Sequence, residues 1–177
     1  MKLDTNKIVK TAALAAIAFI LQVIGSMIGL RVGGFLDVEI SDYPAIIGAF
    51  ALGPLYGVMI ELVKNLLHCT ITNTGFVGEL ANFVVNGIFV FTIGMVYKYN
   101  KTKKGAVLSL ITGGIVLVIA AVFVNLYIML PLYMSDAPYS AKMSIVLTLI
   151  TPFNAARALV LGVITMLSYK KIRPLLK

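Results

Sequence analysis

Residues 43–67 read YPAIIGAFALGPLYGVMIELVKNLL, an apolar stretch that the pair Gly53-Pro54 interrupts near its middle. Proline lacks the amide hydrogen that a helix interior needs, and its ring clashes with the preceding turn. Glycine tolerates backbone angles at which the chain can reverse its direction. The pair therefore predicts two short helices, at about 43–52 and 55–67, with a single kinked helix as the alternative.

Long apolar runs lie on both sides of this stretch. Of the 177 residues 60% are hydrophobic and 12% are charged, so the chain carries more apolar surface than a soluble domain of this length can hide. A helix of about 20 apolar residues crosses the hydrocarbon of a bilayer. We therefore expect an all-α integral membrane protein, a six-transmembrane-helix bundle that forms a single membrane domain over residues 1–177. Its helices are expected at about 8–30, 43–52, 55–67, 78–98, 105–133 and 143–170.

Basic residues gather in three clusters that fix the expected orientation. Lysine and arginine beside a membrane span favour the cytoplasmic side. The clusters are Lys2, Lys7 and Lys10; Lys98, Lys101, Lys103 and Lys104; and Lys170, Lys171, Arg173 and Lys177. With five spans the middle cluster would lie outside, whereas six spans bring all three clusters inside. The charge pattern thus favours the break at Gly53-Pro54 and predicts that both termini are cytoplasmic.

The segment RVGGFLDVEISD (31–42) follows the first expected helix and lies outside in this topology. Its apolar residues partly alternate with other residues, which is typical of an extended chain. We expect it to form an external loop between the first two helices, capping a substrate site at the mouth of the bundle.

Polar side chains inside apolar runs are costly unless they find partners. Arg157 lies deep in the last run, three residues after Asn154, so the two share one helix face. An arginine there is expected to face a polar cavity; pairing with an acid elsewhere, or reaching the outer surface, are the structural alternatives. Asn125 is a candidate to hydrogen-bond either a ligand or a neighbouring helix.

Other polar residues stand near the external ends of the expected helices. Glu61 and Lys64 have the spacing of an intrahelical ion pair. Glu79 and Asn82 open the fourth helix, where the helix dipole favours an acid. His68 is a lone histidine with no partner at metal-ligand spacing, so no metal site is expected.

No enzyme motif is present in the sequence, which lacks a P-loop, GxSxG, HExxH and a dinucleotide fingerprint. We therefore expect no catalytic residue and no cofactor. The net charge of +8 lies beside apolar runs rather than on a soluble basic face, so a nucleic-acid partner is not expected. A small membrane channel or membrane enzyme stays open as an alternative of a different class.

Four stretches together resemble a known family. They are EISDYPAIIGAFALGPLYGVMIELVKNLLH (39–68), TGFVGELANF (74–83), NLYIMLPLY (125–133) and TPFNAAR (151–157). They are similar to the substrate-binding S components of energy-coupling factor (ECF) vitamin transporters, most of all to the riboflavin-specific group. The resemblance implies six helices and capture of riboflavin, the transported substrate, from outside a prokaryotic plasma membrane. FMN, another flavin or a different vitamin remain open as substrates.

The resemblance also implies partners and site residues. A transmembrane coupling subunit (EcfT) and two ATPase subunits (EcfA and EcfA′) would drive uptake. In the family, small residues on the first helix dock the coupling subunit, and that motif maps onto Ala12 and Ala16. The riboflavin group follows its PFN motif with a lysine, which Arg157 replaces here, while Asn154 matches. The expected substrate-binding residues are Asn154, Arg157, Asn125, Leu36, Glu79, Asn82 and Lys64.

Overall fold

The computed structural model describes residues 5–28, 31–32, 36–37, 40–72 and 76–172, and this part of the chain is almost entirely helical. Its α-helices are α1 (Thr5–Ile28), α2 (Tyr43–Ala51), α3 (Pro54–His68), α4 (Val77–Tyr99), α5 (Lys103–Val124), α6 (Leu130–Tyr133), α7 (Tyr139–Ile145) and α8 (Thr151–Ile172). The π-helical segments η1 (Asn125–Met129) and η2 (Val146–Ile150) join α5 to α6 and α7 to α8. Two short strands, β1 (Arg31–Val32) and β2 (Leu36–Asp37), pair antiparallel.

The chain breaks at Gly53, as the glycine–proline pair predicts. Helix α2 ends at Ala51 and α3 begins at Pro54, so the single kinked helix is wrong. Gly53 has φ +118°, a conformation that residues with a side chain rarely adopt. The turn also packs closely, because a Cβ on Gly94 of α4 would lie 2.6 Å from the Cα of Pro54. Two glycines therefore allow α2 and α3 to form a tight helical hairpin against α4.

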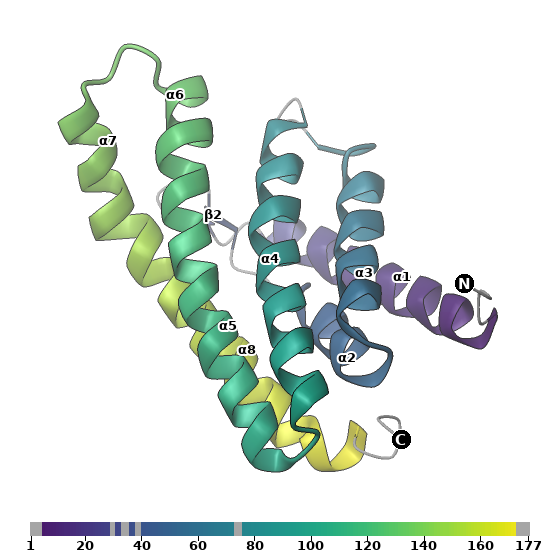
Figure 1. The fold of residues 1–177 in the computed structure, drawn as a ribbon. Helices are drawn as coiled ribbons and strands as arrows, with labels where there is room; N and C mark the ends of the chain where they lie inside the picture. The colour runs from purple at the N-terminus through teal and green to yellow at the C-terminus, as the bar shows by residue number, and fades with distance from the viewer. Residues whose placement is uncertain (1–4, 29–30, 33–35, 38–39, 73–75, 173–177) are drawn as a thin grey trace.

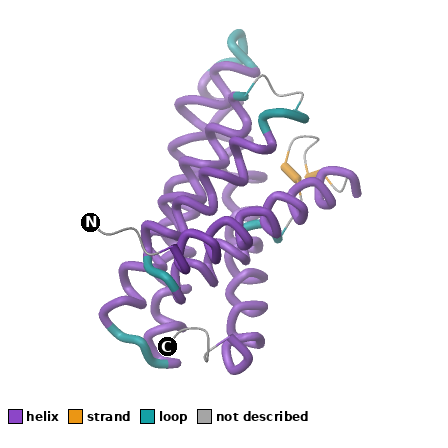
Figure 2. Tube along the Cα trace, turned by 90° about the vertical axis from the view of Figure 1, so that its right-hand side faces the viewer, coloured by secondary structure: helices purple, strands orange, loops and turns teal. Residues whose placement is uncertain are grey.

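Helix α4 occupies the middle of the bundle. It packs against α3 on one side and α5 on the other, and α8 packs against α5 (Figure 1). Helix α1 packs against α2 and α3 and crosses the bundle at a steep angle, with the two strands beside its C-terminal end (Figure 2). The connection between α4 and α5 and the C-terminal end of α8 lie at one end of the molecule, opposite the connection between α6 and α7 (Figure 1).

Four helical stretches in the described residues are long and apolar enough to cross a membrane. They are Thr5–Ile28, Val77–Tyr99, Lys103–Tyr133 and Tyr139–Tyr169. Their outward side chains are largely apolar, as lipid contact requires; Met27 and Leu159, for example, are strongly exposed. Helices α2 and α3 have 9 and 15 residues, so each is shorter than the usual crossing of about 20 residues.

Candidate substrate-binding site

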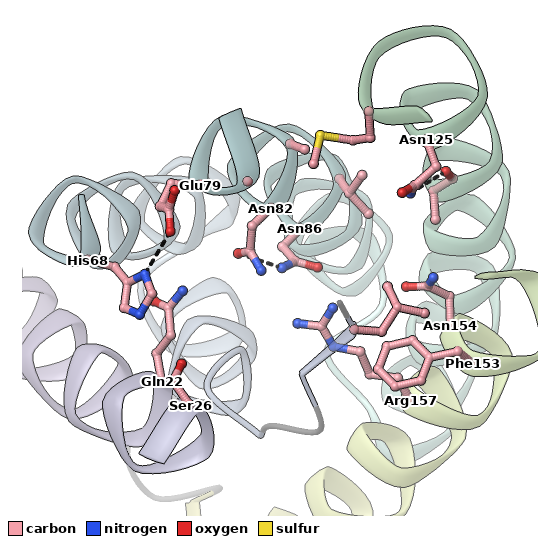
Figure 3. A pocket seen from close by; sticks show the side chains of 16 residues that line it. Gln22, Ser26, His68, Glu79, Asn82, Asn86, Asn125, Phe153, Asn154 and Arg157 are labelled. Atoms are coloured by element: carbon pink, nitrogen blue, oxygen red, sulfur yellow. Dashed lines mark hydrogen bonds and ion pairs between the residues drawn. The ribbon is translucent and has the colours of Figure 1, made fainter. Parts of the chain in front are cut away.

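A cavity of about 170 Å³ lies among α1, α3, α4, η1 and α8, with a residue of β2 at its edge (Figure 3). Five amide side chains line it: Gln22, Asn82, Asn86, Asn125 and Asn154. Three ionisable side chains join them: His68, Glu79 and Arg157. Apolar side chains from Val85, Met129 and Phe153 complete part of the wall. The cavity thus combines apolar surface with a concentration of hydrogen-bonding groups that is typical of a small-molecule site.

Two of the asparagines that line the cavity, Asn125 and Asn154, lie in or close to the π-helical segments. Asn125 begins η1 and Asn154 follows η2 by four residues. Each is close to a proline, Pro131 or Pro152, whose missing amide leaves a carbonyl of the preceding turn without its usual helical partner. Such widened turns occur frequently at functional sites. The prolines thus explain why the helices depart from regular geometry where they meet the cavity.

Hydrogen bonds within the helices hold these amides in place. The side-chain nitrogens of Asn125 and Asn154 donate to the carbonyls of Ala121 and Ile150, at 2.8 and 2.9 Å. Their carbonyl oxygens are therefore the atoms that remain to accept hydrogen bonds from a ligand.

Two further amide side chains, those of Asn86 and Gln22, are stronger evidence for a ligand site. Asn86 Nδ2 donates to Asn82 Oδ1 at 3.0 Å. The oxygen of the same side chain, Asn86 Oδ1, and Gln22 Oε1 are buried and accept no hydrogen bond from the residues that the structure describes. A buried acceptor without a donor costs roughly 1–3 kcal/mol. Both residues line the cavity, so a ligand that carries N–H or O–H groups would satisfy them.

Arg157 projects into the cavity from α8 (Figure 3). Its Nη2 also donates to Asp42 Oδ2, an acid at the start of α2. Lys64 Nζ contacts the other oxygen of Asp42 at 2.7 Å and Glu61 Oε2 at 2.6 Å. Arg157 therefore both lines a polar cavity and pairs with an acid, and its 12% exposed side chain rules out the outer surface.

At the edge of the cavity, His68 and Glu79 form a pair. His68 Nδ1 lies 2.9 Å from Glu79 Oε1, and this contact joins the end of α3 to the first turn of α4. Glu79 thus has a side-chain partner in addition to the favourable helix dipole.

Six of the seven expected substrate-binding residues line this one cavity. They are Asn154, Arg157, Asn125, Leu36, Glu79 and Asn82. Lys64 does not line it: its side chain is 0% exposed and its ammonium lies against Asp42 and Glu61, so the expectation of direct contact is corrected. The predicted Glu61–Lys64 ion pair is confirmed.

Several lining residues were missed by the sequence analysis, chiefly Gln22, Ser26, His68 and Asn86. Gln22 is the only amide in the first apolar run, which is the same signal that identified Arg157. Asn86 lies one turn after Asn82 on the same face. Both could have been found by treating every amide in an apolar run as a candidate.

The first helix presents two different faces. Thr11, Ala15 and Ala18 are buried against the bundle, whereas Ala12 and Ala16 are exposed. The small residues that the resemblance assigns to docking are therefore accessible on the outer face of α1.

Comparison with known proteins shows the family of the chain. Residues 6–169 match the model of the family "ECF transporter, substrate-specific component". The chain is 31% identical to the riboflavin transporter RibU of Staphylococcus aureus (strain TCH60), covering 98% of this chain and 94% of that protein. It is 30% identical to the riboflavin transporter FmnP of Bacillus subtilis (strain 168), covering 97% and 94%.

A solved structure of the S component of a bacterial ECF transporter has the same fold. The two structures superpose with a TM-score of 0.83 at 30% sequence identity, and 98% of each chain is covered. The expected resemblance is thereby confirmed over nearly the whole length. The chain belongs to the substrate-specific components of ECF transporters.

Proposed function

We propose that this chain binds riboflavin on the external side of the cell membrane and delivers it for ATP-driven uptake. As a substrate-specific component it is a transporter subunit and not an enzyme, and it is a multi-pass membrane protein. The relatives from S. aureus and B. subtilis are riboflavin transporters. Within this chain, the proposal rests chiefly on the cavity and on two buried oxygens of its lining residues, Gln22 Oε1 and Asn86 Oδ1. Neither oxygen accepts a hydrogen bond from the residues that the structure describes.

The chemistry of riboflavin suits such a cavity. Its isoalloxazine ring is flat and largely apolar, so side chains such as Val85, Met129 and Phe153 can cover it. Its imide N–H and ribityl hydroxyls are donors for the amide oxygens, and its ring carbonyls can accept from Arg157. A neutral ligand with these groups can therefore donate to Gln22 Oε1 and Asn86 Oδ1 without introducing a new buried charge.

The proposed topology has six crossings and both termini in the cytoplasm. The hairpin of α2 and α3 would add the second and third crossings to the four long apolar stretches, each tilted or partly shielded by its neighbours because both helices are short. The arrangement is supported by the connection between α4 and α5, which carries lysines and lies at the same end of the molecule as the end of α8 (Figure 1).

The external loop at 31–42 is proposed to cap the site. Leu36, in β2, lines the cavity, which supports this role. Residues 33–35 and 38–39 lie outside the described part of the chain.

The proposed partners are a transmembrane coupling subunit (EcfT) and two ATPase subunits (EcfA and EcfA′), since the sequence has no P-loop of its own. The exposed face of α1 around Ala12 and Ala16 is the proposed docking surface. Small residues there would let a helix of the coupling subunit approach closely.

Fluorescence titration of the purified protein tests the proposed substrate. Riboflavin fluorescence should be quenched as the flavin becomes buried, and thiamine, biotin or pantothenate in excess should not restore it. Protein that is colourless and does not quench riboflavin, but binds one of the other vitamins, would assign a different substrate. Ion conduction by the chain alone in liposomes would instead assign a channel.

A further inference from the structure

Asp42 stands at a junction of three helices. It precedes α2, and its side chain is 0% exposed. One carboxylate oxygen accepts from Lys64 Nζ of α3 at 2.7 Å, and the other accepts from Arg157 Nη2 of α8. Because both oxygens are engaged by cations, the orientation of the carboxylate is fixed from two sides.

Lys64 holds Asp42 on the side that does not line the cavity. Besides Asp42, its ammonium donates to Ser41 Oγ at 3.3 Å and contacts Glu61 Oε2 at 2.6 Å. The ammonium thus donates hydrogen bonds to Asp42 and Ser41 and has Glu61 as a second ion-pair partner. The side chain is 0% exposed, so Lys64 is a fixed support for Asp42 and not a group that can swing into the site.

The guanidinium of Arg157 is therefore already paired with an acid at the point where it reaches the cavity. It donates to Asp42, and the other cation on that carboxylate, Lys64, is itself in contact with Glu61. A buried ion is tolerated when its partner is close and correctly oriented, and removing one member leaves an uncompensated charge that is very costly. The guanidinium is thus a hydrogen-bond donor in the cavity more than a free positive charge.

The remaining ionisable groups of the cavity do not favour an anionic ligand. In the described lining they are His68 and Glu79, which contact each other at 2.9 Å. A phosphate would therefore have to compete with Asp42 for the guanidinium and would meet the carboxyl group of Glu79 at the edge of the cavity.

We infer that Asp42, held by Lys64, is a positioning residue that aims the Arg157 guanidinium into the cavity and neutralises it, so that the site selects an uncharged flavin over its phosphate. The inference rests on the proposed function. Arg157 stands where the riboflavin group has a lysine, and arginine is well suited to bind phosphate. In this chain, however, its guanidinium is paired with Asp42.

A double-mutant cycle tests the inference. Dissociation constants for riboflavin and for FMN are measured by fluorescence quenching in the wild type, Asp42→Asn, Arg157→Met and the double variant. The wild type should bind riboflavin about tenfold or more tightly than FMN. Asp42→Asn should weaken riboflavin binding about tenfold and should reduce the ratio of the FMN dissociation constant to that of riboflavin. In the Arg157→Met background, Asp42→Asn should change riboflavin binding by less than about twofold, because it acts through Arg157.

Asp136→Asn is the matched control. Asp136 is exposed in the connection between α6 and α7, so the substitution removes the same charge far from the cavity and should leave both affinities unchanged. If Asp42→Asn yields no folded protein, Lys64→Gln replaces it in the cycle with the same expected dependence on Arg157.

Two results would overturn the inference while leaving riboflavin binding intact. One is equal affinity of the wild type for FMN and riboflavin. The other is an equal loss of affinity from Asp42→Asn with and without Arg157, which would make Asp42 a purely structural residue. A wild-type protein that binds neither flavin would instead refute the proposed function itself.

Discussion

Gln22 and Asn86 hold buried carbonyl oxygens that accept no hydrogen bond within the described residues, and both oxygens border the cavity. Without a bound donor, these two oxygens make the site less stable than an apolar version of it would be. Such a cost is expected where a protein keeps polar groups ready for a ligand.

Gln22→Leu should separate stability from binding. Leucine removes the unsatisfied oxygen at similar volume, so the ligand-free protein should melt at the same temperature or higher, while riboflavin affinity falls about tenfold through loss of a buried hydrogen bond. Thermal melting and fluorescence titration in detergent measure the two effects. Thr165→Val, a buried polar deletion in α8 away from the cavity, should leave affinity unchanged. Unaltered affinity in Gln22→Leu would remove Gln22 from the site.

Single residues also mark the limit of sequence reasoning here. Arg157 and Asn154 line the cavity, and the sequence could single them out because a polar group in an apolar run needs a partner. Lys64 was expected to contact the substrate, but it lies outside the cavity, against Glu61 and Asp42. The sequence predicts the local partner, Glu61, from its spacing, but not Asp42, which lies 22 residues away and is brought to Lys64 only by the fold.

At the level of the elements, the hairpin of α2 and α3 could be predicted because its cause is local. Gly53 and Pro54 end one helix and begin the next wherever they occur in an apolar run. The π-helical segments η1 and η2 could not, because a proline predicts a disturbed turn but not which hydrogen-bond pattern replaces it. The short pairing of β1 with β2 is only partly foreshadowed by the alternation in 31–42.

Gly53→Ala should destabilise the hairpin through the backbone alone. No atom lies within 4 Å of a Cβ built at Gly53, so the cost is that of a side chain at φ +118° and ψ 166°, a region that is essentially restricted to glycine, about 1–3 kcal/mol. The melting temperature in detergent should fall by several degrees, in line with about 1 kcal/mol or more for a chain of this size.

Gly162→Ala is the matched control, because a Cβ there also meets nothing within 4 Å but the residue lies inside the regular helix α8. This variant should be neutral or slightly more stable, since alanine favours helix by up to about 1 kcal/mol. Equal melting temperatures of the two variants would show that the turn does not require a positive φ at Gly53.

On the scale of the whole molecule, the proposed binding cavity and the proposed docking surface lie at different places on the bundle. The cavity is lined by Leu36 of β2, the end of α3 and the start of α4, among others, whereas the accessible small residues of α1 lie on an outer face. Binding and docking should therefore respond to different substitutions.

Ala16→Trp should spare riboflavin binding and abolish uptake. Ala16 is exposed and outside the cavity, so the purified variant should quench riboflavin as the wild type does. A large side chain would keep a partner helix from close approach, so cells that depend on this subunit should take up little labelled riboflavin. Ile111→Trp, at an exposed position of α5, is the control and should transport normally. Normal uptake by Ala16→Trp would move the docking surface elsewhere.

The most direct test of the account is a structure of the protein determined with riboflavin bound. The account predicts the isoalloxazine ring within the cavity formed by α1, α4, η1 and α8, with flavin donors within hydrogen-bond distance of Gln22 Oε1 and Asn86 Oδ1 and with Arg157 still paired to Asp42. A flavin bound at any other place, with those two oxygens still lacking donors, would contradict it.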